Sequence, residues 1–353
     1  HGPPVSIEQP RNLAFLTPTL SYDADNVMLN LTRNDIAFRE FGDKAPETAV
    51  ADKLEALYAN DPDALNGFFA DFIALSDADA RQALRTLNGS SLAGLAKRAG
   101  RSRALSVAQH LSRMGTTTQL QTSRDSQPIY LVSNEPSVDA AAIQGMQARG
   151  QLQQTGIWLQ GIGGQGSVDD STQIYGYDTD VSGAAAGFDI ILRNGVQMGF
   201  SLAHIKQDTE VDQINDSQEI SSNYLSVYAQ QQLDQLHLSG AFGFGSSSID
   251  TRRDIVIGST TLHATGDTDG SDIFGYAEAA YDLTRSGNFT LQPVAGLAVA
   301  QTIVSDFFEQ GAGALNLQVE EQKRTSAETK LGGRLVYGDA AGKLSAQAYL
   351  LWE

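Results

Sequence analysis

Charged residues interrupt several alternating apolar segments in the second half of the chain, and these residues are candidates for a polar site. The interruptions are Asp189, Glu278, Lys330, Arg334 and Glu353. Successive side chains of a β-strand point to opposite faces, so Asp189 would lie opposite Phe188 and Ile190. By the same rule Arg334 would lie opposite Leu335. A charge in apolar surroundings is costly unless it is paired and hydrogen-bonded, so we expect these charges to share a polar face.

Other residues that could support catalysis or bind a metal carry weak signals. The histidines are His1, His110, His204, His237 and His263. Their spacings are not those of metal ligands, and the absence of cysteine excludes thiolate sites and a cysteine nucleophile. The glycine-rich residues 161–166 lack the following helix and the Lys-Ser/Thr pair of a phosphate loop, which indicates a strand end. We expect no catalytic residue, metal site, cofactor or enzyme activity in this chain.

The composition argues against a nucleic-acid partner and against a membrane-spanning helix. The 24 Lys and Arg residues face 42 Asp and Glu residues, and the formal net charge of -18 argues against a nucleic-acid partner, which needs a basic surface. The chain lacks an apolar run of about 18 residues, so we expect no helix that spans a bilayer. Crossing by strands needs only alternation of apolar and polar residues.

Residues 156–353 alternate apolar with small or polar residues in about nine segments, which predicts β-strands. The segments start near Gly156, Tyr177, Val196, Glu219, Leu236, Ser271, Asn288, Ala327 and Lys343. Short connections at residues 193–195, 233–235 and 286–288 contrast with long polar stretches at 166–174, 207–218, 246–270 and 310–326. Short turns at one end and long loops at the other are typical of an antiparallel transmembrane β-barrel.

The parity of these strands predicts which side chains face lipid. The predicted lipid-facing residues are Phe188, Ile190, Met198, Phe200 and Leu202. The opposite parity carries Asp189, so the charged residues of the strands are expected to face the lumen, because a charge facing lipid costs up to a few kcal/mol near the bilayer midplane.

Residues 44–114 change to a helical period. Val50, Leu54, Leu57 and Tyr58 recur at spacings of three and four residues. The sequence further predicts an N-cap at Asp61 with Pro62 in the first turn, an apolar core stripe that includes Phe68, Phe69 and Phe72, an N-cap at Ser76, and a left-handed helix end at Gly89. We interpret this part as a small α-helical segment.

The remaining segments are shorter. Residues 1–43 contain two short strands around an Asp-rich turn and are expected to pack on preceding residues. Residues 115–155 are polar and predict a linker, with a helix over residues 137–154 that contains Arg149.

In this order, the segments resemble the C-terminal part of a type Va autotransporter of Gram-negative bacteria. The resemblance is carried by residues 20–32 (the end of a passenger β-helix), 49–88 (the helical segment after it), 156–160 (the first barrel strand), 176–178 and 187–189 (the second), 292–297 and 308–311 (later strands) and 351–353. The family pattern has twelve strands and an aromatic last residue, so we expect the barrel to be incomplete at Glu353.

The resemblance implies a mainly β fold whose barrel, residues 156–353, exports an N-terminal passenger across the outer membrane to the cell surface. The implied partners are outer-membrane lipid, the barrel-assembly machinery and the chain's own passenger. The alternative is that the chain is part of a surface-anchored hydrolase or adhesin whose active passenger lies upstream. The lumen charges could hold the helix that contains Arg149, or they could merely solvate the interior.

Overall fold

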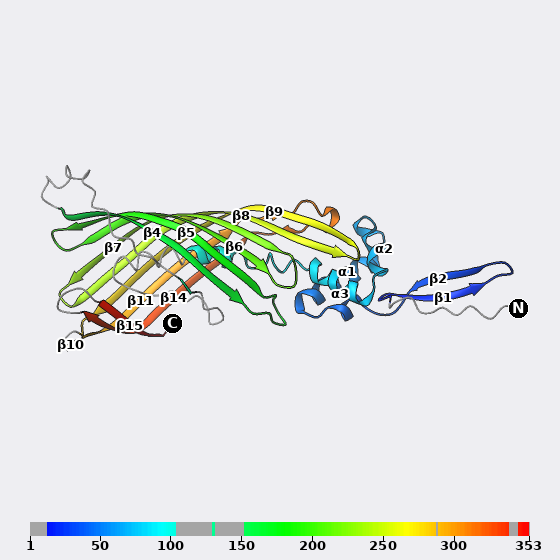
Figure 1. Ribbon diagram of the computed structural model, residues 1–353, viewed down its shortest axis with the longest axis horizontal. Coiled ribbons are helices and arrows are strands. Elements are labelled where there is room, and N and C mark those ends of the chain that lie inside the picture. Colours follow the sequence, from blue (N-terminus) through cyan, green and yellow to red (C-terminus); the bar gives the residue numbers. More distant parts are fainter. Residues whose placement is uncertain (1–12, 104–128, 131–151, 287–288, 339–344, 353) are drawn as a thin grey trace.

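The computed structural model describes residues 13–103, 129–130, 152–286, 289–338 and 345–352 (Figure 1). One long curved sheet forms most of the molecule, helices α1, α2 and α3 lie beyond one end of it, and a two-stranded hairpin lies farther out on the same side. The expected mainly β architecture with an antiparallel sheet and a small helical segment is confirmed.

The outermost element is the hairpin of β1 (Leu16–Tyr22) and β2 (Val27–Arg33). Its turn forms because the Asp23 carboxylate accepts hydrogen bonds from the backbone N–H groups of Asp25 and Asn26, at 2.8 and 2.7 Å. The predicted Asp-rich turn is confirmed, and the assignment of this hairpin to the end of a β-helix stays a prediction.

The helices are η1 (Phe38–Phe41), α1 (Ala45–Asn60), η2 (Ala64–Gly67), α2 (Phe68–Ile73) and α3 (Asp77–Leu87), and residues 95–103 form a further helical stretch. We call residues 38–87 the helical segment. The N-cap at Ser76 is confirmed, since Ser76 Oγ accepts the N–H of Asp79 at 3.2 Å. Gly89 has the predicted left-handed backbone at the end of α3, with φ +59°.

The predicted helix start at Asp61 is wrong. Asp61 directly follows α1, and α2 begins only after Gly67, whose φ of +84° is a left-handed conformation that glycine adopts without strain. Leu57, expected on the apolar face of α1, is exposed because the core contacts of that helix run through Ala51 and Leu54.

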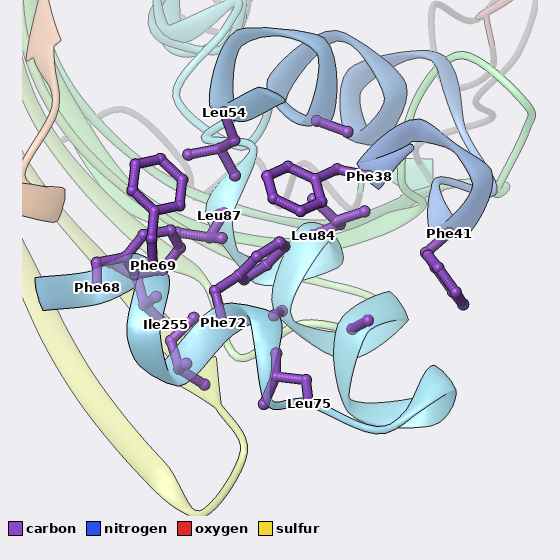
Figure 2. Close-up of a cluster of buried hydrophobic side chains, with 14 of the residues drawn as sticks. Phe38, Phe41, Leu54, Phe68, Phe69, Phe72, Leu75, Leu84, Leu87 and Ile255 are labelled. Atoms are coloured by element: carbon purple, nitrogen blue, oxygen red, sulfur yellow. The ribbon is translucent and has the colours of Figure 1, made fainter. Parts of the chain in front are cut away.

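Aromatic rings form the core of the helical segment (Figure 2). Phe15 stacks on Phe72 with ring centroids 5.4 Å apart, and Phe38 meets Phe72 edge to face at 4.9 Å. Phe68 and Phe69 complete the predicted stripe, and all of these rings are buried. Aromatic pairs in these geometries add about 0.5–1.5 kcal/mol each beyond area burial.

Nine long antiparallel strands build the described sheet, and they match the nine expected from the sequence. They are β4 (Leu152–Val168), β5 (Tyr177–Leu192), β6 (Gln197–Val211), β7 (Ser217–Leu233), β8 (Leu236–Ile257), β9 (Thr260–Tyr281), β11 (Phe289–Val304), β14 (Gln322–Gly338) and β15 (Ser345–Trp352). Each pairs with its neighbours in chain order, and the sheet is not closed within the described residues.

Short elements complete the described fold. They are β3 (Ile129–Tyr130), β10 (Thr284–Ser286), β12 (Phe307–Phe308), η4 (Gly313–Leu315) and β13 (Gln318–Val319). Ile129–Tyr130 pairs with Gly164 and Gln165 of β4, next to the edge of the sheet.

Two of the predicted long loops are wrong. Residues 246–270 continue β8 and β9, which pair without interruption from Ser246 and Ser271 to Ile257 and Thr260. The connection at residues 207–218 shortens to 212–216, because β6 extends to Val211. In both places polar inward-facing residues take part in the alternation, so the pattern resembles a polar loop.

The alternation divides the sheet into two faces. In β6, every second residue from Ser201 to Val211 is buried, and the residues between them are exposed or half-buried. We call the buried side the inner face. The outer face carries exposed apolar side chains on neighbouring strands, among them Leu202, Leu225, Val227, Phe242, Phe244, Leu297 and Val299.

Gly187 on the inner face is required by a neighbouring ring, which yields a first prediction. A Cβ at residue 187 would collide with the Trp158 indole and the Phe200 carbonyl, whereas one at Gly163 meets nothing nearer than the Val181 carbonyl at 4.0 Å. We expect Gly187→Ala to destabilise the sheet by an overpacking cost of about 1–3 kcal/mol. The temperature at which the sheet unfolds in detergent should therefore fall. Gly163→Ala is the matched control, and equal unfolding temperatures for the two variants would contradict this reasoning.

Candidate functional site on the inner face and at its mouth

Four of the charged residues singled out in the sequence lie buried on the inner face. They are Asp189, Glu278, Lys330 and Arg334. The structure brings Glu278 and Arg334 together across β11, with Arg334 Nη1 3.4 Å from Glu278 Oε1. Arg334 Nε also donates to Gln292 Oε1 at 2.6 Å. Lys330 belongs to the same neighbourhood, because its Nζ lies 6.0 Å from the centroid of the Tyr276 ring, whose hydroxyl donates to Glu278.

Asp189 belongs to a separate group on the inner face. It accepts a hydrogen bond from the Tyr228 hydroxyl, which in turn accepts one from Trp158 Nε1 at 2.9 Å. The cross-strand neighbour of Trp158 is Gly187, which leaves room for the indole. Asp189, Tyr228 and Trp158 thus form a buried hydrogen-bonded chain on the inner face.

Two predicted site residues, Arg149 and Glu353, lie outside the described residues. The expected helix over residues 137–154 is wrong at its end, because Leu152, Gln153 and Gln154 already belong to β4. Its earlier residues also lie outside the described part of the chain.

The predicted lipid-facing residues lie on the outer face. Leu202, Phe200 and Met198 of β6 are 57%, 47% and 36% exposed, and Phe188 and Ile190 of β5 are half-buried. The rings of Phe188 and Phe200 are neighbours, with centroids 6.0 Å apart. Contact of this face with lipid stays a prediction.

The helical stretch 95–103 lies against the inner face, a placement that the sequence did not reveal. Arg103 Nη1 lies 3.3 Å from Asp272 Oδ1 and donates to Thr302 Oγ1 at 2.7 Å. The apolar side of the stretch packs on the same face, where Leu95 and Ala99 join a buried cluster with Ile220, Ile249, Val304 and Phe307. The available signal was the acid at position 272, on the buried parity of β9.

The helical segment contacts the sheet at one end, which we call the mouth, where the connections 169–176, 212–216, 258–259 and 305–321 lie. The first connection contacts the start of α1: its Asp170 Oδ2 lies 2.6 Å from Lys44 Nζ, and its Thr172 carbonyl accepts the N–H of Ala45 at 3.2 Å. The Tyr175 hydroxyl donates to the fully buried Glu47, and burial raises the pKa of Tyr175.

A buried ion pair joins the mouth to α3. Arg253 Nη2 lies 2.7 Å from Glu309 Oε2, and both side chains are 1% exposed. Arg253 Nη1 also donates to the Thr86 carbonyl in the last turn of α3, at 3.1 Å. The guanidinium therefore satisfies an otherwise unpaired carbonyl at the negative end of that helix.

Asp216 is the second buried group at the mouth. Its carboxylate accepts hydrogen bonds from Ser91 Oγ and, at 3.2 Å, from the Asp254 N–H. Burial raises the pKa of Asp216 to about 6 although these hydrogen bonds, and the nearby Arg253, act in the opposite direction. Asp170 differs, because the hydrogen bond from Lys44 lowers its pKa.

These contacts hold a polypeptide segment in place at the mouth. Within the described residues, no group of three or more His, Cys, Asp and Glu side chains could hold a metal ion. None of the helices in the described part of the chain combines the length and the apolarity that crossing a membrane requires.

The raised pKa of Asp216 predicts a pH dependence for the docking of Ser91, and of the helical segment that precedes it in the chain, at the mouth. The pKa of this carboxyl is about 6 in the folded protein, against an ordinary value of 3.8, so the folded state binds the proton more tightly. The contribution of Asp216 to stability therefore falls as the pH rises between these two pKa values, by up to about 3 kcal/mol. Protease resistance of the helical segment should be greater at pH 5 than at pH 7, and Asp216→Asn should remove much of the difference. Asp170→Asn is the control. The pKa of Asp170 is lowered, so its contribution to stability falls as the pH falls and does not fall as the pH rises.

A family model described as "Autotransporter beta-domain" matches residues 157–353. An extracellular serine protease of Serratia marcescens is 25% identical over 342 residues, which cover 91% of this chain and 32% of that protein, so the chain spans about a third of its relative. The translocator domain of the autotransporter NalP from Neisseria meningitidis is 13% identical, with a TM-score of 0.44 over 72% of this chain and 82% of that chain. The outer membrane transporter YddB from Escherichia coli is 11% identical, with a TM-score of 0.30 over 70% of this chain and 36% of that chain. The family model covers more than half of the chain, which therefore belongs to the autotransporter family and carries its outer-membrane β-domain.

Proposed function

We propose that the inner face of this sheet is the path by which the passenger leaves, and that the helical segment docks at the mouth once export ends. The observation that carries the proposal is the helical stretch 95–103, which follows the helical segment after the turn at residues 88–94 and lies against the inner face, where Arg103 pairs with Asp272. A family β-domain is an outer-membrane translocator for a passenger. The mouth, with the helical segment, would then face the cell exterior.

The buried charges are assigned to this path. Asp189, Glu278, Lys330 and Arg334 would line the lumen, and the apolar outer face, including Leu202 and Phe200, would contact lipid. The burial of the charges and the exposure of the apolar residues support these roles. Asp272 is a further charge on this face, which the sequence did not single out. Its partner Arg103 belongs to a helix, so for Asp272 the first of the two alternatives is favoured, in which a lumen charge holds a helix.

A second candidate function concerns the part of the polypeptide outside this sequence. The relative from Serratia marcescens is named an extracellular serine protease and is about three times as long as the aligned part. We infer that the passenger could be a hydrolase of this kind, with an adhesin as the other option, and that the present chain contributes export and anchoring without catalysis. The barrel-assembly machinery is the proposed partner for insertion of the sheet.

Export can be tested with an epitope fused before His1 and directed to the periplasm by a supplied signal peptide. The epitope should become accessible to antibody on intact cells. Leu202→Arg should reduce this signal, because a lipid-facing arginine costs about 2–4 kcal/mol near the midplane. Gln232→Arg, at an exposed position of β7 next to a turn, is the control that should export normally. An assembled, membrane-inserted sheet whose epitope stays inaccessible would contradict the proposal.

The placement of the helical stretch can be tested by a cross-link, because the chain has no cysteine of its own. A Cβ at Gly100 would lie 3.3 Å from Thr302 Oγ1, a separation that suits a disulfide. The pair Gly100→Cys and Thr302→Cys should oxidise in assembled protein and change its migration under non-reducing conditions. Gly100→Cys with Thr290→Cys, near the other end of β11, should stay reduced. Equal cross-linking of both pairs would argue against the placement.

A further inference from the structure

Glutamines recur on the inner face of the described strands, from one end of the sheet to the other. They occupy the buried or half-buried parity of the alternation. They are Gln160 of β4, Gln197 and Gln207 of β6, Gln218 and Gln230 of β7, Gln292 of β11 and Gln322 of β14. A glutamine carboxamide is neutral and carries both a hydrogen-bond acceptor and two donors, a combination that the charged side chains lack.

At the mouth, two of these glutamines bind the main chain of the polypeptide beside them. Gln322 Nε2 donates to the Leu92 carbonyl at 2.9 Å, and Gln322 Oε1 accepts the N–H of Ala96 at 3.4 Å. The carboxamide of Gln218 donates to the Ser91 carbonyl. These three bonds use no side chain of the bound segment, so they do not depend on its sequence.

Gln160 lies midway along β4 (Leu152–Val168), away from the mouth. Its side chain is buried, with 2% of the residue exposed, and within the described residues neither its Oε1 nor its Nε2 has a hydrogen-bond partner. An unpaired buried carboxamide is costly, and native structures rarely keep one without a reason. A ligand that offers a donor and an acceptor together would satisfy both of its groups.

Further glutamines line a cavity of about 350 Å³ at the end of the inner face opposite the mouth. Gln230 Nε2 donates to Gln197 Oε1 at 2.7 Å. Gln292 Oε1 accepts from Arg334 Nε at 2.6 Å, and the charge of that arginine is paired with Glu278. Carboxamides are therefore present at both ends of the inner face and in the middle.

The chemistry of these groups suits an extended main chain of any sequence. Every residue except proline carries one N–H donor and one carbonyl acceptor, and both need partners when they leave water. A fixed charge would hold oppositely charged side chains strongly, whereas a neutral carboxamide makes weaker hydrogen bonds. Passage through a pore requires contacts that are strong enough to let the traversing molecule enter and weak enough to let it leave.

We propose that the inner-face glutamines are binding sites for the main chain of a polypeptide in transit, and that Gln160 is the site midway along the path. This inference rests on the proposed export function, and it adds the group that is recognised, which is the peptide backbone irrespective of side chains. The segment bound by Gln218 and Gln322 shows the same recognition at the mouth.

The test compares Gln160→Met, which keeps the length of the side chain and removes its hydrogen-bonding groups, with Gln160→Asn, which keeps a carboxamide. The readout is the rate at which the epitope before His1 becomes accessible on intact cells after a pulse of synthesis. Gln160→Met should slow this rate about threefold or more, as expected for one lost hydrogen bond. Gln160→Asn should keep at least about half of the unaltered rate. The unfolding temperature of the assembled Gln160→Met sheet should be unchanged or higher, because methionine leaves no buried polar group unpaired.

Gln165→Met is the matched control, since Gln165 lies on the same strand with the opposite parity and is exposed. The slowing by Gln160→Met should be equal for two fused passengers of the same length, one rich in glycine and serine and the other rich in lysine and glutamate. Main-chain recognition is overturned if Gln160→Met exports at the unaltered rate, if Gln165→Met is slowed equally, or if only one passenger is slowed. It is also overturned if Gln160→Met unfolds at a lower temperature, because instability would then explain the slow export.

Failure of the export function is read separately, from the unaltered chain. If its epitope stays inaccessible on intact cells, export is contradicted, and Gln322→Met in detergent then tests main-chain binding alone. Protease should cut residues 88–94 of this variant at least about threefold faster than those of Gln165→Met, because two main-chain hydrogen bonds are lost. Equal cleavage of the two variants would overturn main-chain binding, whatever the result on cells.

Discussion

The strict alternation of side chains along an antiparallel ladder is the constraint on which the rest of the structure depends. A ladder places every second residue on the same face, so a single shift of register would move Asp189 to the outer face and Phe188 to the inner one. In lipid each such inverted charge would cost up to a few kcal/mol, depending on its depth. The pairing register therefore fixes the polarity of both faces together.

Burial of charge at the mouth follows from the same separation of faces. Arg253 and Glu309 are almost inaccessible to water, and an ion pair in such surroundings offsets its desolvation only if its remaining polar atoms also find partners. They do, because the carbonyls of Thr86 and Leu315 accept from the guanidinium and the Leu317 N–H donates to Glu309. These partners come from α3 and from the connection 305–321, so satisfying one buried arginine ties the helical segment to two parts of the sheet.

Much of this architecture could be predicted from the sequence, because alternation over ten or more residues is hard to produce by chance. The strands of residues 156–353 and the side of Asp189 and Arg334 follow from parity alone. The distal hairpin was missed because its inward residues, such as Thr251 and Arg253, face polar groups and helices, so their pattern resembles that of a loop. The contact of Arg103 with Asp272 joins residues 169 positions apart, and a single sequence contains no signal for such a pairing.

The direction of the chain connects these observations. Residues 95–103 follow the inner face from the mouth, and the first long strand, β4, begins at Leu152, which pairs with Leu192 beside the short turn at the opposite end of the sheet. The first long strand then runs from that end towards the mouth and finishes at Val168. The N-terminal helical segment and the start of the first long strand thus lie at opposite ends of the sheet. A translocator that delivers its own N-terminal part across a membrane requires this arrangement, because the two ends of the sheet must open on different sides.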